Sequence, residues 1–315
     1  MEIDKFKYFI ALNYTMWFSF TKTELFALEA LCVGEQTPKG LAVALRKNAS
    51  FVSRVLGKLE EKGLILRNGR LVKLSPAGHA QAFKRLYDSR PNAKIEEALW
   101  GSAMDVLLIL AGSEEGVGLD AIVEEADCSR ATVFKALKTL YSAGLVAKNG
   151  RNITITDQFA AFFAAAYANS LADVLLTGSK GYNVSIRVRK HVVVRTDAKA
   201  VPDFFNKTGI NKLMEKGLEA VKTSYDDYYF DLGRVKRDIS TEEAFIHALL
   251  LTTLQQHQDR PVLTSFLIKN GQKLRSSMLR GLAKKYLVEG VAVDLEKEVE
   301  LMRNVASYHQ KGLAP

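Results

Sequence analysis

One pattern of residues occurs twice in this chain, 81 positions apart, and it limits the possible folds more than any other feature. The first copy runs from Phe51 to Val72 and the second from Thr132 to Ile153. Each copy has helical spacing of apolar residues, then glycine, then two short apolar runs separated by Asn-Gly-Arg. Glycine ends helices because it tolerates the left-handed conformation, and Asn-Gly between apolar runs favours a tight hairpin. Each copy is therefore expected to be a helix followed by a β-hairpin.

Further helices are predicted before each copy. Thr21 to Glu24 form a capping box for a helix that runs to about Cys32, and Pro38 can open the next helix. Ser50 is expected to cap the third helix, which runs through Lys62. In the second copy the three predicted helices span 100–111, 119–126 and 129–142. Three helices and a hairpin are typical of a winged helix-turn-helix, so two such domains are predicted in tandem.

The remaining chain is predicted to form a third domain. Strands are expected at 185–189 and 192–195 because these runs are rich in β-branched residues. Helices are expected at 202–222, 241–256, 260–270, 273–286 and 294–308. The predicted fold class is α+β and predominantly helical, with two tandem winged helix-turn-helix domains and a C-terminal α+β domain. The predicted domains are 1–92, 93–177 and 178–315.

Two apolar segments suggest buried or paired surfaces. Residues 1–20 are rich in aromatic side chains, which favours a helix packed on its own domain or a dimerisation helix. The helix expected from Gln158 is apolar nearly all round, so it should be buried between units or in a dimer interface. A membrane span there is the weaker interpretation, because Asn169, Ser170 and Asp173 interrupt it. Charges near the start argue against a signal peptide, and the two cysteines have no CxxC spacing, so a cytoplasmic protein is expected.

The net charge of +9 is unevenly distributed along the chain. Residues 1–92 carry +7, residues 93–177 carry −5 and residues 178–315 carry +7. The middle domain nevertheless has five basic and no acidic residues between Cys128 and Thr156. The matching window, Lys47 to Ser75, has seven basic and two acidic residues, so both windows come to +5. The acidic residues of the middle domain thus lie outside this basic window.

These windows contain the candidate DNA-binding residues. The second helix of a helix-turn-helix enters the major groove with its N-terminal residues toward the base edges, and a wing tip can reach the backbone or minor groove. The candidates in the first copy are Ser50, Phe51, Ser53, Arg54, Lys58, Arg67, Asn68, Arg70 and Lys73. Those in the second are Arg130, Ala131, Thr132, Lys135, Lys138, Lys148, Asn149 and Arg151. The expected partner is double-stranded DNA, bound by a homodimer, although basic helix faces are often merely solvated and tandem winged helices also dock proteins.

Two motifs of the first copy are Leu59-Glu60-Glu61-Lys62-Gly63-Leu64-Ile65 and Leu74-Ser75-Pro76-Ala77-Gly78. They are similar to the helix end, wing and post-wing helix of the MarR/ArsR-like winged-helix transcription regulators, which residues 21–87 resemble. Residues 140–146 match the same place in the second copy, but the Ser-Pro-x-Gly element is missing after its wing. The resemblance implies a DNA-binding transcription regulator.

A fainter resemblance concerns residues 231–244. Asp231-Leu232-Gly233-Arg234-Val235 and Ile239-Ser240-Thr241-Glu242-Glu243-Ala244 are similar to abortive-infection-type antitoxins. That resemblance implies a protein partner for the C-terminal domain, a nucleotidyltransferase-like toxin. Tandem winged helices also occur in replication initiators, which remains a further alternative.

Catalytic and metal-binding patterns are weak. The chain has no GxxxxGK[ST], HExxH or GxSxG motif and no GxGxxG after a predicted strand, so no enzyme, cofactor or metal is expected. The five histidines are scattered and are interpreted as structural. Asp226 and Asp227, which lie among tyrosines, are interpreted as a solvated loop, with a ligand or metal site as the alternative.

Overall fold

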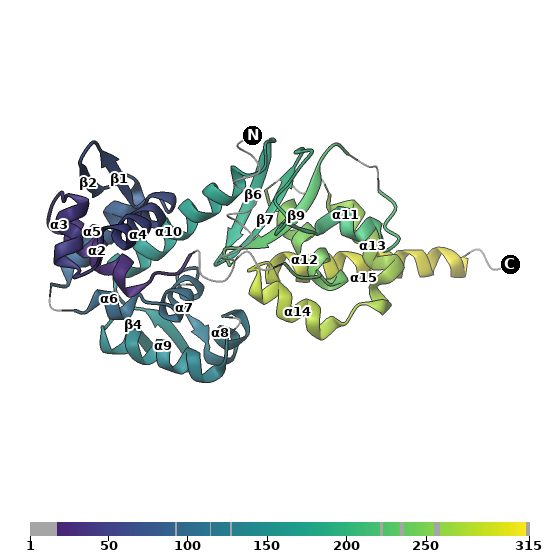
Figure 1. Ribbon diagram of the computed structural model, residues 1–315. Coiled ribbons are helices and arrows are strands. Elements are labelled where there is room, and N and C mark those ends of the chain that lie inside the picture. Colours follow the sequence, from purple (N-terminus) through teal and green to yellow (C-terminus); the bar gives the residue numbers. More distant parts are fainter. Residues whose placement is uncertain are drawn as a thin grey trace. The chain divides into compact units, whose positions relative to one another are not determined.

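The computed structural model describes residues 18–312, with gaps at 92, 114, 127, 221–222, 234–235 and 255–258, and side chains as far as residue 303. The chain divides into two compact units, residues 1–174 and 175–315 (Figure 1). The fold is α+β and predominantly helical, as predicted. The aromatic helix predicted for residues 1–20 lies outside the described residues, except for the last three.

The first unit contains two groups of helices, each followed by a hairpin. The elements of the first group are α2 (Lys22–Val33), α3 (Pro38–Ala44), α4 (Ala49–Glu61), β1 (Ile65–Asn68), β2 (Leu71–Leu74) and α5 (Gly78–Ser89). Those of the second are α6 (Ile95–Ala98), α7 (Ser102–Leu110), β3 (Val117–Gly118), α8 (Leu119–Glu125), α9 (Arg130–Ser142), β4 (Val146–Asn149), β5 (Asn152–Ile155) and α10 (Gln158–Leu176). The order of elements follows the predicted repeat.

Local side-chain caps determine where these helices begin. The predicted capping box is present, since the Thr21 hydroxyl accepts from the Glu24 backbone at 3.2 Å and the Glu24 carboxylate accepts from the Thr21 backbone at 2.6 Å. The predicted cap at Ser50 is wrong. Asn48 caps α4 instead, because its side-chain oxygen accepts from the backbone N–H of Phe51 at 2.8 Å. Ser50 lies in the first turn of α4 and donates to that same oxygen at 3.0 Å.

The two hairpins have the same local geometry. Asn68 pairs with Leu71 in the first and Asn149 with Asn152 in the second. The glycines at the two tips have φ of 60° and 61°, and those after the two helices have φ of 68° and 66°. A side chain at those four positions would be strained, which explains the shared glycines. The second hairpin gains a third strand, as β3 pairs with β5, whereas the first has only the single bridge between Gln36 and Val72.

Helix α10 contributes to the core of the first unit. Phe163 stacks against Phe20 and meets Phe83 edge-on, and the hydroxyl of Tyr167 donates to the carbonyl of Phe18 at 2.9 Å. Its buried residues follow helical spacing, at 160, 163, 164, 167, 168, 171, 172 and 175. The helix is long and apolar enough by composition to cross a membrane, but this stripe packs as a core helix does. The other side of the helix is partly exposed, with Phe162 at 51%, and its burial between units or in a dimer interface stays a prediction.

The second unit is built on a four-stranded antiparallel sheet in the order β6-β7-β9-β8. Its elements are β6 (Asn183–Val188), β7 (His191–Thr196), β8 (Asn206–Lys207), α11 (Gly209–Met214), β9 (Asp226–Asp231), α12 (Thr241–Thr252), α13 (Arg260–Asn270), η1 (Gly271–Lys273), α14 (Ser276–Lys285) and α15 (Glu289–Gly312). Helices α11 and α12 pack on the sheet (Figure 1). The long helix predicted for 202–222 is wrong, because that segment contains a strand and a short helix.

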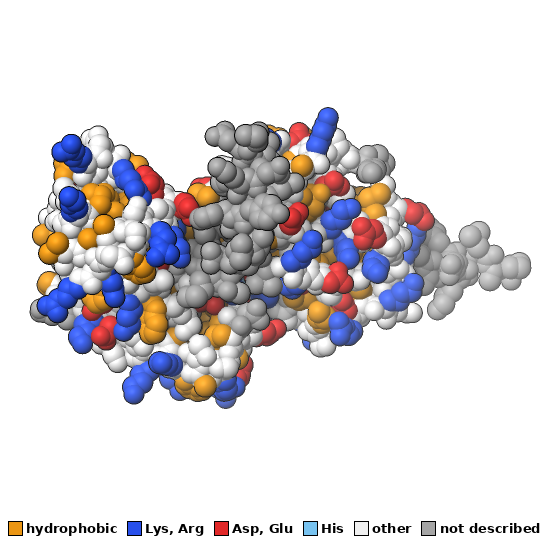
Figure 2. Space-filling view, viewed as in Figure 1, with side chains coloured by type: hydrophobic (Ala, Val, Ile, Leu, Met, Phe, Trp, Pro, Cys, Tyr) orange, Lys and Arg blue, Asp and Glu red, His pale blue; other side chains and the backbone are white. Residues whose placement is uncertain are grey.

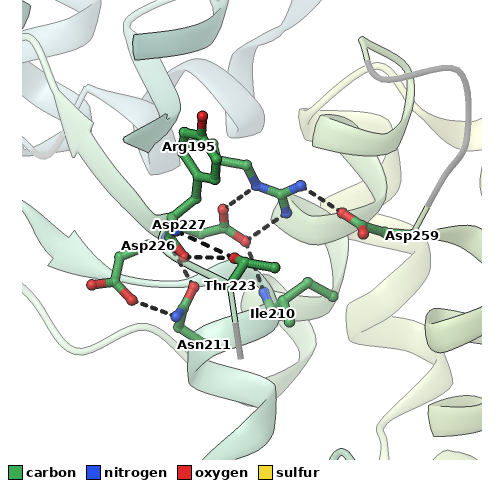
Figure 3. Close-up of polar contacts among 8 residues, drawn as sticks. Arg195, Ile210, Asn211, Thr223, Asp226, Asp227 and Asp259 are labelled. Atoms are coloured by element: carbon green, nitrogen blue, oxygen red, sulfur yellow. Dashed lines mark hydrogen bonds and ion pairs between the residues drawn. The ribbon is translucent and has the colours of Figure 1, made fainter. Parts of the chain in front are cut away.

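The interpretation of Asp226 and Asp227 as a solvated loop is also wrong. Both lie in β9, and Asp227 is only 1% exposed. Its carboxylate accepts from Arg195 Nε at 2.6 Å and from the backbone N–H of Ile210 at 3.0 Å. Figure 3 shows Arg195 between Asp227 and Asp259, the second of which accepts at 2.6 Å. A carboxylate can be buried in a strand because this cation and these donors replace water.

Candidate nucleic-acid interface

Helix α4 keeps its predicted DNA-binding residues away from the core. Val52, Val55, Leu56 and Leu59 form the buried stripe. Ser50, Ser53, Arg54 and Lys58 are exposed, and Phe51 is half-buried. The Arg54 guanidinium lies 5.8 Å from the centre of the Phe51 ring and forms no ion pair with a described residue. It is therefore available for a guanine or a phosphate.

Helix α9 has a similar arrangement but a different charge environment. Arg130, Lys135 and Lys138 are exposed. Arg130 Nη1, however, lies 2.7 Å from Asp120 Oδ1 on α8. Thr132 is half-buried, and its hydroxyl is 2.8 Å from the hydroxyl of Ser129, which caps the helix. Two of the predicted contacts of α9 thus have internal partners in the protein without DNA.

The β1–β2 and β4–β5 hairpins, which are the two wings, also differ in ion pairing, but here it is the first copy that has the internal ion pairs. In the first wing Arg67 pairs with Glu60 at 3.0 Å and donates to the Ser53 carbonyl at 3.3 Å. Lys73 lies 3.9 Å from Glu35, a contact at the limit of an ion pair. Asn68 and Arg70 are exposed at the tip. The first wing therefore holds its basic side chains mainly by internal pairing.

In the second wing Lys148, Asn149 and Arg151 are all exposed. Neither Lys148 nor Arg151 forms an ion pair within the described part of the chain. Figure 2 shows Lys and Arg side chains over the β1–β2 hairpin and around α9. The predicted residues of each copy thus lie on one helix and on the hairpin that follows it. We call the helix, α4 or α9, the reading helix, and the hairpin, β1–β2 or β4–β5, the wing.

Lys62 is not part of the exposed basic surface that the charge count predicted. It was counted in the first basic window, but it is 3% exposed. Its ammonium donates to the Ser19 carbonyl at 2.8 Å, pairs with Glu24 at 3.1 Å and lies over the Phe20 ring. Burial lowers the pKa of Lys62, and Glu24 opposes that shift. The signal was available, because Lys62 follows Val55 and Leu59 at helical spacing on the buried side.

The turn after each reading helix is held by a side chain from elsewhere. In the first copy the His79 ring nitrogen lies 3.0 Å from the Lys62 carbonyl. In the second copy Arg90 donates to the carbonyls of Ala143 and Gly144 at 3.2 and 3.3 Å. Arg90 also pairs with Asp157 at 2.7 Å. Arg90 lies near the predicted boundary between the domains 1–92 and 93–177, and no local pattern indicates this role.

The second unit has a buried polar cluster that the sequence did not indicate. Burial would raise the pKa of Glu243, but a bidentate bond from Arg237, with contacts of 2.8 and 2.7 Å, lowers it to about 2. The Tyr286 hydroxyl donates to Glu243 at 2.6 Å. Burial lowers the pKa of His247 to about 3, and its Nδ1 lies 2.7 Å from the Thr208 hydroxyl. These contacts stabilise the core around β9 and α12.

One comparison with known proteins bears on this interface. Residues 103–150 match the IclR helix-turn-helix domain family. The matched segment runs from α7 through α9 to the tip of the β4–β5 hairpin, so it contains most of the candidate residues of the second copy. No curated protein matches the chain. The match names a different family from the MarR/ArsR-like group, and it supports a DNA-binding transcription regulator with a helix-turn-helix domain.

Proposed function

We propose that the protein is a sequence-specific transcription regulator that binds double-stranded DNA through two winged helices. The first would be α4 with the β1–β2 hairpin, and the second α9 with the β4–β5 hairpin. The observation that carries the proposal is the exposed basic surface of α9 and its wing, which lies in the segment that matches a DNA-binding domain family. Among the described residues, this surface combines exposed cations with the matched DNA-binding segment.

The first copy is included in the proposal because of its local geometry. Each copy has a side-chain cap at the start of its reading helix, a left-handed glycine at its end and a hairpin with an Asn-Gly tip. Gln36 and Val72 form a β-bridge at positions that correspond, 81 residues on, to Val117 and Ile153, which also pair. This correspondence supports a second DNA-binding unit of the same kind.

The acidic residues of 93–177 lie outside the helix that we propose to contact DNA. Asp105, Glu125 and Asp157 are each less than 10% exposed. Helix α9 has no acidic residue. Phosphates approaching this helix would therefore meet mainly Lys135, Lys138 and the wing, while the exposed Asp120 is paired with Arg130.

We further propose that the protein acts in the cytoplasm as a homodimer, with the C-terminal unit available to an effector or a protein partner. A dimer would place two copies of the α4–α9 pair on an operator with two-fold symmetry. A footprint tests this directly. A symmetric footprint with half-sites about one helical turn apart is expected, whereas a short asymmetric footprint would indicate a monomer.

The decisive experiment measures the affinity of the full-length protein for DNA at several salt concentrations. With about six phosphates contacted, the logarithm of the association constant should fall with the logarithm of salt concentration with a slope near −5. Absence of duplex binding, together with a stoichiometric co-purified protein, would replace the proposal with the protein-docking alternative. A footprint over direct repeats near an origin would instead favour a replication initiator.

A further inference from the structure

Phe134 is a large apolar side chain on the reading helix of the second copy. It lies in the second turn of α9 and is 51% exposed. The Arg130 guanidinium lies 5.8 Å from the centre of its ring. Single exposed apolar residues are common on protein surfaces, so exposure alone carries no function. The charged residues around this ring suggest a function for its exposure.

The ring lies among cations. Lys135 follows it directly, Lys138 lies one turn further on the same side, and both are exposed. The carboxylate of Asp120, which lies beside Arg130, is paired with that arginine. A surface of this charge is complementary to a polyanion. If α9 enters the major groove through these cations, the Phe134 ring enters the groove as well.

The first copy differs at the corresponding position, which is Ser53. There the side chain is a small exposed hydroxyl, and Arg67 from the wing donates to the Ser53 carbonyl and pairs with Glu60. Lys148 corresponds to Arg67 in the second copy, and it forms no ion pair within the described residues. The Phe134 ring itself is 51% exposed.

We propose that Phe134 contacts the 5-methyl group of a thymine in the major groove, and so gives the second copy a preference for an A·T pair. This inference rests on the proposed function. The thymine methyl is the apolar group that the major groove presents, and an aromatic side chain is a suitable partner for it. Ser53 and Arg54 of the first copy read bases through hydrogen bonds instead.

The test uses a duplex that the full-length protein selects from a random-sequence library. Each thymine within the footprint is replaced in turn by deoxyuridine, which removes the methyl group and keeps every hydrogen bond. Burying one methyl group corresponds to about a fourfold change in affinity. One such replacement should weaken the wild-type protein about fourfold and leave Phe134→Ala unaffected. The variant itself should bind the unmodified duplex about fourfold more weakly.

Ser53→Ala is the matched control, because it should keep the full response to that replacement. A deoxyuridine effect of equal size in wild type and Phe134→Ala, or no effect at any thymine, would overturn the inference while leaving DNA binding intact. Unchanged DNA affinity of Phe134→Ala with a loss of self-association would also overturn it and assign the ring to a protein contact. Failure of the wild type to bind any duplex would overturn the proposed function itself. A thermal unfolding curve for each variant shows that it is folded.

Discussion

The two helix-hairpin copies share a backbone but are stabilised by different residues. In the first copy, the turn that follows α4 contains Lys62, a buried cation that is paired with Glu24. Ala143 corresponds to it in the second copy, and there Arg90 from the preceding segment binds the turn. The same local geometry is thus reached with different long-range partners. The comparison teaches that a repeat in sequence predicts the backbone better than it predicts the contacts that hold it.

The exposed surfaces differ in a complementary way. In the first copy Arg54 on the reading helix forms no ion pair with a described residue, whereas Arg67 in the wing is paired with Glu60. The second has Arg130 paired with Asp120 and a wing whose basic residues form no ion pair with described residues. We therefore expect base recognition to depend more on the helix in the first copy, and more on the wing and Phe134 in the second.

The largest effect is expected from Lys62→Met. The variant leaves the Glu24 carboxylate buried without a cation, and the Ser19 carbonyl without its donor. The free energy of unfolding should fall by about 3–5 kcal/mol, measured by urea denaturation. Lys58→Met, an exposed change on the same helix, should stay within about 0.5 kcal/mol. Equal stability of the two variants would contradict the role given to Lys62.

A smaller loss is expected from Arg90→Met. Asp157 would lose its cation and two turn carbonyls would lose a donor, but the Arg90 side chain is 32% exposed and water can replace part of these contacts. The free energy of unfolding should fall by about 2 kcal/mol. Arg85→Met, an exposed change on α5, is the control. A loss larger than that of Lys62→Met would reverse the comparison between the two turns.

The two reading helices are compared by Arg54→Ala and Arg130→Ala. Arg54→Ala should weaken binding to the selected duplex by about 1–3 kcal/mol and relax its sequence preference. Arg130→Ala should cost less, because Asp120 already competes for its guanidinium. Lys73→Ala should weaken all duplexes uniformly and reduce the salt slope by about 1. Competition binding with mutated duplexes measures all three. If neither arginine matters, the assignment of the reading helices is wrong.

Glu29 should make stability depend on pH in the first copy. Burial, together with repulsion from and a hydrogen bond with Glu96, raises the pKa of Glu29 to about 8. The folded protein therefore keeps a proton that the unfolded chain releases above about pH 4.5, so stability falls as the pH rises from 4.5 to 8. After solvent screening the loss should be about 1–2 kcal/mol.

Glu29→Gln is expected to remove this pH dependence, as measured by thermal unfolding at pH 5 and pH 8.5. The second copy has Leu110 at the corresponding position, buried at 1% exposure, and so it lacks this titration. Glu97→Gln, an exposed change, serves as the control and should leave the pH profile as it is. An unchanged profile in Glu29→Gln would show that another group causes the dependence.

The smallest effect is expected from Asp120→Asn. The change removes the carboxylate that holds Arg130 and leaves the arginine to the DNA. An exposed ion pair is worth only about 0.5 kcal/mol, so affinity should rise about two- to threefold at low salt. Asp88→Asn, an exposed change on α5, should have no effect. Weaker binding by Asp120→Asn would mean that the ion pair positions Arg130 for the DNA.

The sequence predicted those parts of the fold that depend on neighbours along the chain. The capping box at Thr21, the two Asn-Gly hairpins and the apolar stripes of α4 and α9 each involve residues within a few positions of one another. The cap of α4 was misplaced by two residues, because Asn48 and Ser50 are both suitable and only the backbone geometry distinguishes them. The candidate residues on the exposed faces followed from the same periodicity.

The sequence by itself therefore determined the repeated helix-hairpin pattern, its basic windows and a predominantly helical α+β chain. The tertiary structure alone decided what the buried charges contact. Lys62 reaches a carbonyl 43 residues away, Arg90 a carboxylate 67 residues away and Arg195 carboxylates 32 and 64 residues away. Such partners leave no periodic signal, because burial of a charge depends on the field and the donors that distant segments bring to it.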